Sequence, residues 1–182
     1  GTRPDFMTLA KAITSGYQPL GALMVADRVA QVLVGEGGEF FHGYTYSGHP
    51  VASAVALANL DILEREGIVD RVRDELAPYW AARWSELSAH PLVGEARSLG
   101  LFGALELVPG KPSRPFFPER GTVGTRARDL AMKNGLVMRA VWDTLIAAPP
   151  LVITRAEIDE LVSKAVQTLD QLHHELRRDG LV

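Results

Sequence analysis

Short apolar segments bounded by glycine and proline alternate along this chain with longer segments that repeat their apolar residues at helical spacing. The segments "DFMTLA" (residues 5–10) and "LGALMVA" (20–26) are typical of buried strands, and the turn "SGYQP" joins them. Further apolar segments of strand length lie at 93–108, where a turn divides two strands, and at 136–140 and 145–151. This alternation of strands and helices predicts an α/β fold.

The longer segments carry helix end signals. The alanine-rich segment that starts at Pro50 ends at Gly67, where glycine favours a helix C-cap, and its few charges predict a buried helix. Thr154 and Glu157 form a T-x-x-E capping box at the start of the last helix, which Gly180 closes. The expected helices cover residues 26–35, 50–67, 68–90, 123–134 and 154–180.

Two of these helices are predicted to be amphipathic. Each repeats its apolar residues at the spacing of one helix face, so its charged residues are expected to face water. The predicted apolar stripe of the helix over 68–90 consists of Val69, Val72, Leu76, Trp80, Trp84 and Leu87. That of the last helix consists of Ile158, Leu161, Val162, Ala165, Val166, Leu169 and Leu172.

The two ends of the chain differ in their predicted organisation. Residues 1–66 have the pattern of one piece of an α/β sheet domain, and residues 67–182 that of a smaller α/β unit. The chain begins with "GTRPDF", lacks an initiating methionine and enters a strand within five residues, so we expect a fragment. We also expect uncovered strand edges and an apolar helix face in 1–66, so that the isolated chain is poorly soluble or folds only in its C-terminal half.

Composition excludes several classes of function. The net charge is -3 at pH 7, so there is no basic surface of the kind that binds nucleic acid or anionic membranes. The chain contains no cysteine, which excludes disulfides, thiolate metal sites and a cysteine nucleophile. No apolar run approaches the ~20 residues that span a bilayer. We therefore expect a cytoplasmic protein without nucleic-acid or membrane partners.

Lys11 is the first candidate for chemistry. It lies between Ala10 and Ala12 at the exit of the first predicted strand. A lysine becomes a nucleophile toward carbonyl groups when desolvation or nearby cations lower its pKa, and it then forms a Schiff base. The alternative is an ordinary exposed lysine at a strand end, which is the more common situation. The local sequence alone leaves both interpretations open.

The segment "FFHGYTYSGHP" (40–50) precedes the helix that starts at Pro50 and is rich in hydroxyl groups, which belong to Tyr44, Thr45, Tyr46 and Ser47. Hydroxyl groups and free backbone N–H groups at a helix N-terminus bind phosphate, so this loop is a candidate phosphate site. The alternative is that Ser47 or Gly48 simply caps the helix. His42 and His49 resemble a metal pair, but no carboxylate joins them at ligand spacing, so we do not expect a metal site.

Arg139 emerges from the apolar segment "VMRAVWD" (137–143). Its planar guanidinium is suited to bind a substrate carboxylate. The alternative is an ordinary salt bridge, with Asp143 as the nearest candidate partner.

Three separated blocks of this sequence strongly resemble the class III pyridoxal-phosphate aminotransferases, in particular the omega-transaminase (amine:pyruvate aminotransferase) group. The blocks are "PDFMTLAKAITSGYQPLGALMV", "HGYTYSGHPVASAVALANLDILEREG" and "MRAVWDTLIAAPPLVITRAEIDELV", which occur in the order of the family. The resemblance covers nearly the whole chain. It implies the C-terminal part of a fold-type I transferase: residues 1–66 as the end of the large mixed-sheet domain, and 67–182 as the small C-terminal α/β domain.

The resemblance also implies roles for particular residues. Lys11 matches the lysine that forms the internal aldimine with pyridoxal 5'-phosphate. Thr45 matches the threonine that binds the cofactor phosphate across the interface of a homodimer, with the backbone of Tyr44 beside it. Arg139 matches the mobile arginine that pairs with a substrate carboxylate. The implied reaction is a ping-pong transfer of an amino group from an amine donor to a keto acid such as pyruvate, with Lys11 moving the proton.

The sequence departs from the family in length. The phosphate-binding glycine and serine loop, the stacking aromatic residue and the aspartate at the pyridine nitrogen would precede residue 1, so the isolated chain is expected to be inactive. Asp5 is not that aspartate and is expected to cap a strand. Trp142 stands where relatives often carry a small residue, and it either packs or narrows the substrate pocket. Two alternatives remain: an inactive remnant or association module, and an aminomutase or decarboxylase of the same fold.

Overall fold

A computed structural model describes residues 2–35, 37–111 and 116–182. The chain divides into two compact units, Gly1–Gly67 and Ile68–Val182. Among the described residues, no helix is both long and apolar enough to cross a membrane.

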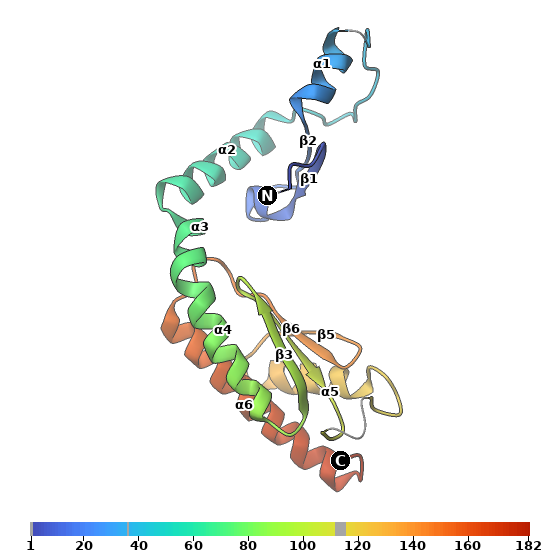
Figure 1. Cartoon of the computed structure of the whole chain (residues 1–182), viewed down its shortest axis with the longest axis vertical. Coiled ribbons are helices and arrows are strands. Elements are labelled where there is room, and N and C mark those ends of the chain that lie inside the picture. The colour runs from blue at the N-terminus through green and yellow to red at the C-terminus, as the bar shows by residue number, and fades with distance from the viewer. Residues whose placement is uncertain (1, 36, 112–115) are drawn as a thin grey trace. The chain divides into compact units, whose positions relative to one another are not determined.

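The first unit contains a two-stranded antiparallel sheet (Figure 1). Strand β1 (Phe6–Ala10) pairs with β2 (Gly21–Val25), and Ala10 lies opposite Gly21. Between the strands lies a 3-10 helix, Lys11–Thr14. Two helices follow, α1 (Asp27–Gly35) and α2 (Pro50–Arg65).

The first unit buries little of its apolar surface. The predicted strands and helices exist, but most residues of β1 and β2 are exposed, and only Ala52 and Ala56 of α2 are buried. The burial predicted for these segments one by one is therefore wrong, whereas the uncovered apolar surface expected for residues 1–66 is confirmed. The physical reason is that β1 and β2 pair with each other alone among the described strands, and a single pair covers neither face. Large exposed apolar side chains of this unit include Phe6, Met7, Leu23, Met24, Phe40, Phe41, Val51, Leu57, Leu60 and Ile62.

Asp5 directly precedes β1, and its contacts differ from the strand cap expected of it. Its backbone carbonyl accepts a hydrogen bond from Ala26 N at 2.9 Å, and its carboxylate forms an ion pair with Arg28 of α1. Asp5 therefore links β1 to the start of α1.

The second unit begins with one continuous helical segment that changes its winding. It runs through α3 (Ile68–Arg71), a π-helical turn (Val72–Leu76), α4 (Ala77–Glu86) and a short 3-10 helix (Leu87–Ala89). The predicted helix over 68–90 is thus confirmed, although its uniform α-helical winding is not. Five of the six residues of the predicted stripe are buried or partly buried, whereas Val69 is exposed.

A four-stranded antiparallel sheet follows, with the strand order β3-β4-β6-β5. Helix α6 packs against α4 and α5, while α4 packs against β3 and α5 against β5 and β6 (Figure 1). The predicted strand at 145–151 ends early, at Ala147, because Pro149 and Pro150 cannot donate to a strand ladder. The elements are β3 (Val93–Leu99), β4 (Phe102–Leu107), α5 (Thr122–Lys133), β5 (Arg139–Val141), β6 (Thr144–Ala147) and α6 (Arg155–Arg178).

The core of this unit contains two stacked indoles. The ring centroids of Trp80 and Trp84 are 4.6 Å apart, and both side chains are fully buried. A Cβ atom at Gly103 of β4 would lie 2.6 Å from Trp80, so the close approach of sheet and helix requires glycine there. The indole N–H of Trp84 donates to Ala104 O at 3.3 Å.

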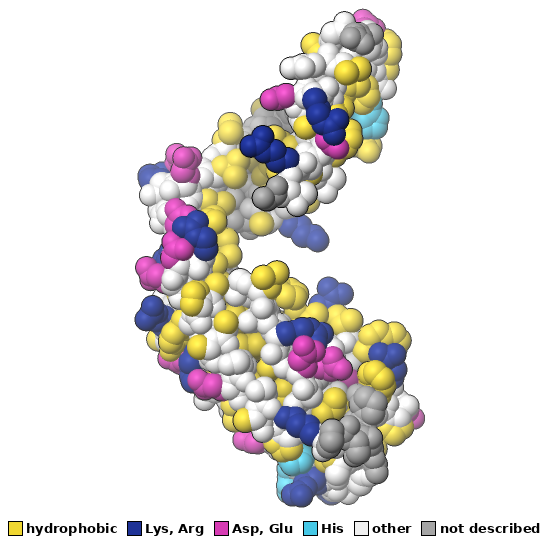
Figure 2. Space-filling view, in the orientation of Figure 1, with side chains coloured by type: hydrophobic (Ala, Val, Ile, Leu, Met, Phe, Trp, Pro, Cys, Tyr) yellow, Lys and Arg dark blue, Asp and Glu magenta, His cyan; other side chains and the backbone are white. Residues whose placement is uncertain are grey.

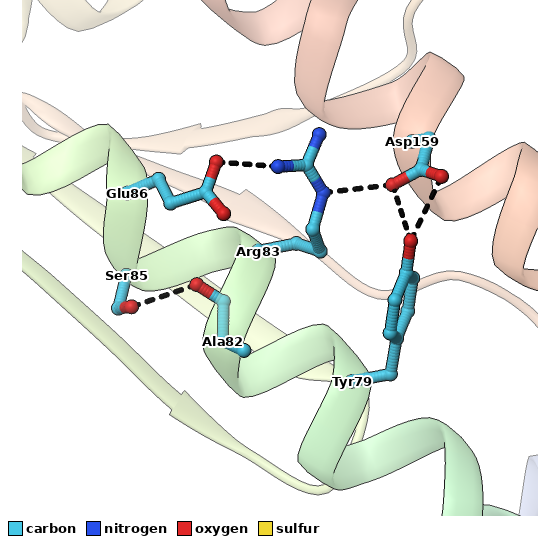
Figure 3. A network of polar contacts seen from close by, with 6 residues as sticks. All are labelled: Tyr79, Ala82, Arg83, Ser85, Glu86 and Asp159. Carbon is cyan, nitrogen blue, oxygen red and sulfur yellow. Dashed lines mark hydrogen bonds and ion pairs between the residues drawn. The ribbon is translucent and has the colours of Figure 1, made fainter.

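Helix α6 begins as the sequence predicts. Thr154 Oγ1 accepts from Glu157 N at 3.2 Å, and the Glu157 carboxylate accepts from Thr154 N at 2.7 Å, which confirms the capping box. The predicted apolar stripe is largely buried, but Val166 is exposed. A polar cluster joins α6 to α4: Asp159 accepts hydrogen bonds from Tyr79 at 2.7 Å and from Arg83 at 2.7 Å (Figure 3).

Candidate active site

Lys11 occupies a strained turn directly after β1. Its backbone φ is 54°, in the left-handed region, which costs a residue other than glycine roughly 1–2 kcal/mol. Its side chain is exposed in this chain, as in the alternative interpretation of an exposed lysine at a strand end. Ser15, at the other end of the 3-10 helix, also has a positive φ of 49°. Both ends of the turn that carries Lys11 therefore hold strain that other contacts must maintain.

Asn59 of α2 supplies such contacts. Its side-chain amide donates to two carbonyl oxygens of the 3-10 helix, Ala12 O at 3.0 Å and Ile13 O at 3.2 Å. Its own oxygen accepts from Ser15 Oγ at 2.6 Å. The helix α2 is thereby attached to the turn of Lys11 at three atoms.

Thr14 is the buried member of the same turn, with 1% of its surface exposed. Its hydroxyl lies 2.6 Å from Gln18 O and 3.4 Å from Lys11 O, and it donates to the nearer acceptor. Sequence reasoning missed both Thr14 and Asn59. The available signal was a single amide in the otherwise apolar and small-residue stretch "AVALANL" of the helix.

The loop before α2 folds back on its own backbone. Ser47 Oγ accepts a hydrogen bond from Tyr44 N at 2.9 Å. The helix cap is His49, whose Nδ1 accepts from Ala52 N at 3.3 Å, so the predicted cap by Ser47 or Gly48 is wrong. Pro50 at the first helical position has no N–H, so the first turn has one donor fewer to be satisfied.

An open pocket of about 580 Å³ lies at this loop. Three kinds of group line it: the aromatic rings of the loop, the Ser47 hydroxyl, and the segment that leads into β2. Thr45 is exposed in the same loop, and its hydroxyl has no hydrogen-bond partner among the residues that the structure describes. The lining residues are Gln18, Pro19, Leu20, Gly21, Tyr44, Tyr46, Ser47, Gly48, His49 and Ala52.

Arg139 is the first residue of β5, in the second unit, and is exposed. The alternative ion pair with Asp143 is wrong. Asp143 is 9% exposed, and its carboxylate instead accepts from Gly121 N and Gly124 N, each at 2.9 Å. Across residues 2–35, 37–111 and 116–182, no ion pair involves Arg139. Its guanidinium is therefore available to an external anion.

Trp142 forms the tip of the hairpin between β5 and β6, with a positive φ of 52°. The Arg120 guanidinium lies 5.2 Å from its ring centroid, a cation–π contact, and Gly121 lies beneath the indole. The side chain thus packs on its neighbours, while 61% of it remains exposed.

The structure distributes the candidate residues over both units. Lys11, Tyr44 and Thr45 belong to the first, and Arg139 belongs to the second. The first unit holds an amine on a strained turn and a loop of hydroxyl and amide groups, which are suited to a carbonyl group and to a phosphate respectively. The second holds an exposed guanidinium, which is suited to a carboxylate.

Comparison with known proteins gives consistent matches. The chain is 54% identical over 171 residues to a putrescine–pyruvate aminotransferase of Pseudomonas aeruginosa, covering 94% of this chain and 37% of that protein. An (S)-enantioselective omega-transaminase from Thermomicrobium roseum superposes with a TM-score of 0.87 at 40% identity, over 94% of this chain and 38% of that one. A PMP-bound aminotransferase from Vibrio fluvialis gives 0.87 at 33% identity, over 96% and 39%.

The chain therefore spans about two fifths of the length of these relatives. Its mixed α/β architecture matches their transaminase structures, which confirms the predicted fold class and the resemblance. The model of the family described as aminotransferase class-III matches residues 1–169. This chain belongs to the class-III aminotransferase family.

Proposed function

We propose that the protein containing this chain is a pyridoxal 5'-phosphate-dependent aminotransferase that moves an amino group from an amine donor to a keto acid such as pyruvate. The observation that carries the proposal is Lys11, held at φ 54° directly after β1 in a chain that matches the class-III model over residues 1–169. The relative named putrescine–pyruvate aminotransferase supports pyruvate as acceptor. In this proposal residues 1–66 end the cofactor-binding domain, and 67–182 form the small domain.

The residues present fit this cofactor. When bound, pyridoxal 5'-phosphate supplies an aldehyde carbon that amines attack and a ring that withdraws electrons from the reacting carbon. Lys11 offers the amine that would hold the aldehyde, and the pocket loop offers hydroxyl and amide groups for the phosphate. The relative in its PMP-bound form carries the aminated state of the same cofactor.

Lys11 has two tasks in the proposed reaction. Its amine would hold the cofactor before the donor arrives, and once released it would lie as a free amine beside the reacting carbon of the substrate. There it would accept the proton of the substrate carbon and donate it to the carbon of the cofactor. The reaction runs in two halves, and the deaminated donor leaves before the keto acid binds.

Thr45 and the backbone of Tyr44 are assigned to the cofactor phosphate of a second copy of the chain. Thr45 is exposed, whereas the Tyr44 N–H donates to Ser47 Oγ at 2.9 Å in the loop that precedes α2, so binding by Tyr44 would require its N–H to exchange Ser47 for the phosphate. Such a loop presents its phosphate-binding groups outward, where a homodimer partner would use them. The homodimer is part of the proposal, as is the cytoplasmic location.

Arg139 is assigned to the carboxylate of the keto acid. Its exposure and its lack of an ion pair within the described ranges leave the guanidinium unneutralised. A bidentate pair with a carboxylate is among the stronger polar contacts in proteins.

The deciding experiment locates the covalent attachment. The complete protein is incubated with pyridoxal 5'-phosphate, reduced with borohydride and digested, and peptide masses show which lysine carries the cofactor. The chain offers four lysines, Lys11, Lys111, Lys133 and Lys164. We expect label at Lys11, none in Lys11→Ala, and normal labelling in the exposed control Lys133→Ala.

Label at another lysine, or turnover retained by Lys11→Ala, would refute the assignment.

Product analysis with pyruvate as acceptor separates transamination from the other chemistries of this fold. Alanine and a deaminated donor in equal amounts are the expected products. Loss of carbon dioxide, or a rearranged amine without alanine, would instead indicate a decarboxylase or an aminomutase.

A further inference from the structure

We propose that Asn59 is a positioning residue for Lys11: it maintains the left-handed backbone from which the lysine amine projects. The proposal rests on the proposed role of Lys11 as cofactor anchor. Three observations carry it, namely the hydrogen bonds of Asn59, the positive φ angles at both ends of the turn, and the buried Thr14 hydroxyl.

The hydrogen bonds of Asn59 add to those that the turn makes itself, since Ala12 O also accepts from Ser15 N at 3.2 Å. A 3-10 helix of four residues leaves most of its carbonyl oxygens without a partner inside the helix. Asn59 donates to two consecutive ones, Ala12 O and Ile13 O, from a different element more than forty residues away. The turn therefore takes its shape from α2 as well as from its own sequence.

Both strained residues adjoin these contacts. Lys11, at φ 54°, immediately precedes Ala12, and Ser15, at φ 49°, donates to the Asn59 oxygen at 2.6 Å. Left-handed residues other than glycine persist where surrounding contacts determine them. Asn59 uses its amide donor at one side of the turn and its acceptor at the other, so a single side chain opposes relaxation at both ends.

Thr14 also stabilises this turn, through a hydrogen bond to a segment other than α2. Its buried hydroxyl donates to Gln18 O at 2.6 Å, and Gln18 lines the pocket at the phosphate-binding candidate loop. The turn of Lys11 is thus fixed to α2 through Asn59 and to the segment leading into β2 through Thr14.

A fixed backbone matters because the lysine side chain is itself flexible. Its four rotatable bonds let the amine sweep a wide volume unless the Cα–Cβ direction is set. Holding reacting groups near their productive geometry accounts for large rate effects in catalysis. If the turn relaxes to a right-handed conformation, the amine departs along a different direction, and attachment to the cofactor slows.

The test compares matched variants of the complete protein. Asn59→Asp keeps the shape and the acceptor for Ser15 but replaces the amide donor with a carboxylate facing two carbonyl groups. Asn59→Ala removes the side chain without adding charge and suits the alanine-rich helix, so it serves if the aspartate variant does not fold. Asp61→Asn, an exposed change on the same helix, is the control.

The main measurement is the rate at which apoprotein attaches pyridoxal 5'-phosphate to Lys11, quenched with borohydride at set times. Loss of two hydrogen bonds predicts attachment about tenfold slower in Asn59→Asp and Asn59→Ala, and an unchanged rate in Asp61→Asn. Amide hydrogen exchange of the cofactor-free protein should speed up in residues 11–15. Asn59→Gln, which keeps the donor, should recover part of the rate.

A merely structural role would lower the melting temperature without changing the attachment rate of the folded protein. Attachment at Lys11 in both Asn59 variants within about twofold of the wild-type rate would overturn the proposal while leaving the proposed function intact. Failure of the wild-type protein to attach the cofactor at Lys11 would instead refute the proposed function itself.

Discussion

Arg139 has no ion pair within the described ranges and stands at the start of a strand, so its contribution should appear in substrate binding rather than in folding. We expect Arg139→Ala in the complete protein to weaken transition-state binding of a keto acid by about 2–3 kcal/mol, because one charged, hydrogen-bonded pair is lost. The loss for an aldehyde acceptor without a carboxylate should be small. Steady-state kcat/KM with both acceptors measures this.

The partly exposed Arg128, which pairs with its neighbour Asp129, provides the control variant Arg128→Ala. Equal losses with the two acceptors in Arg139→Ala would show that Arg139 has a structural role.

Gly124 determines how closely α5 approaches the β5–β6 hairpin. A Cβ atom there would lie 2.0 Å from the carbonyl oxygen of Trp142 and 2.9 Å from Asp143 Cα, both backbone atoms that cannot rotate away. Gly124→Ala should therefore lower the free energy of unfolding by about 1–3 kcal/mol or more, since overpacking forces the backbone to shift. Urea denaturation measures it. Gly110, where a Cβ would meet no atom of the described residues within 4 Å, gives the control Gly110→Ala, and similar midpoints for the two variants would contradict the prediction.

At this scale the sequence identifies candidate chemical groups but not the backbone conformation that carries them. Residue type and surroundings make Lys11, Thr45 and Arg139 candidates, because amine, hydroxyl and guanidinium groups have characteristic uses. The left-handed backbone of Lys11 and the contacts of Asn59 were not predicted, since they depend on residues 44 to 47 positions apart. The same holds for Asp143, whose partners are amide groups on a distant helix rather than the arginine four residues before it.

The elements α4 and α6 are joined by the cluster around Asp159 (Figure 3). Hydrogen bonds from Tyr79 and then Arg83 lower the pKa of Asp159 below its ordinary value of 3.8. The folded state therefore binds this proton less readily than the unfolded state. The resulting stability is fully present above pH 3.8 and is lost as the pH falls through the folded-state pKa.

Asp159→Asn should accordingly lower the melting temperature at pH 7 and differ less from the wild type as the pH falls below about 4. Thermal unfolding followed by circular dichroism across this range checks it. Glu160→Gln, an exposed change one residue along α6, is the control. A difference from wild type that stays constant with pH would show that the Asp159 charge is not involved.

Periodicity predicts the buried face of a helix correctly where the surrounding unit supplies a core against which that face packs. The stripe of α6 and the capping box at Thr154 are confirmed because local spacing and tertiary packing agree there. The alanine-rich α2 has the same apolar character, yet most of its surface is exposed, because the first unit offers it few neighbours. Periodicity identifies the apolar face of a helix but not what covers that face.

For the whole molecule, the two units should differ in independent stability. The second unit buries a contiguous core of leucine, valine and tryptophan side chains, whereas the first exposes large apolar groups, several of which are visible at the surface (Figure 2). We expect residues 68–182 alone to unfold cooperatively on heating, and residues 1–67 alone to be poorly soluble without a cooperative transition. Calorimetry of both pieces tests this. A sharp transition in the isolated first unit would contradict it.

The proposed sharing of cofactor sites between two copies predicts complementation. If each site combines Lys11 of one copy with Thr45 of the other, a mixed dimer of Lys11→Ala and Thr45→Ala chains contains one complete site. Mixing the two inactive or weakened variants, with separate affinity tags to isolate mixed dimers, should restore activity above either parent. Mixed dimers of differently tagged Lys11→Ala chains are the control. Mixed dimers no better than Thr45→Ala alone would place both residues in the same site of one copy.

The carboxylate of Asp143 has a consequence for the order of folding. It accepts the amide hydrogens of Gly121 and Gly124, so the N-terminus of α5 is capped by a residue that the ribosome adds about twenty positions later. No side chain at the N-cap position of α5 itself performs this task. We therefore expect the start of α5 to stay frayed during synthesis until the β5–β6 hairpin has closed, so that helix and hairpin form as one cooperative unit.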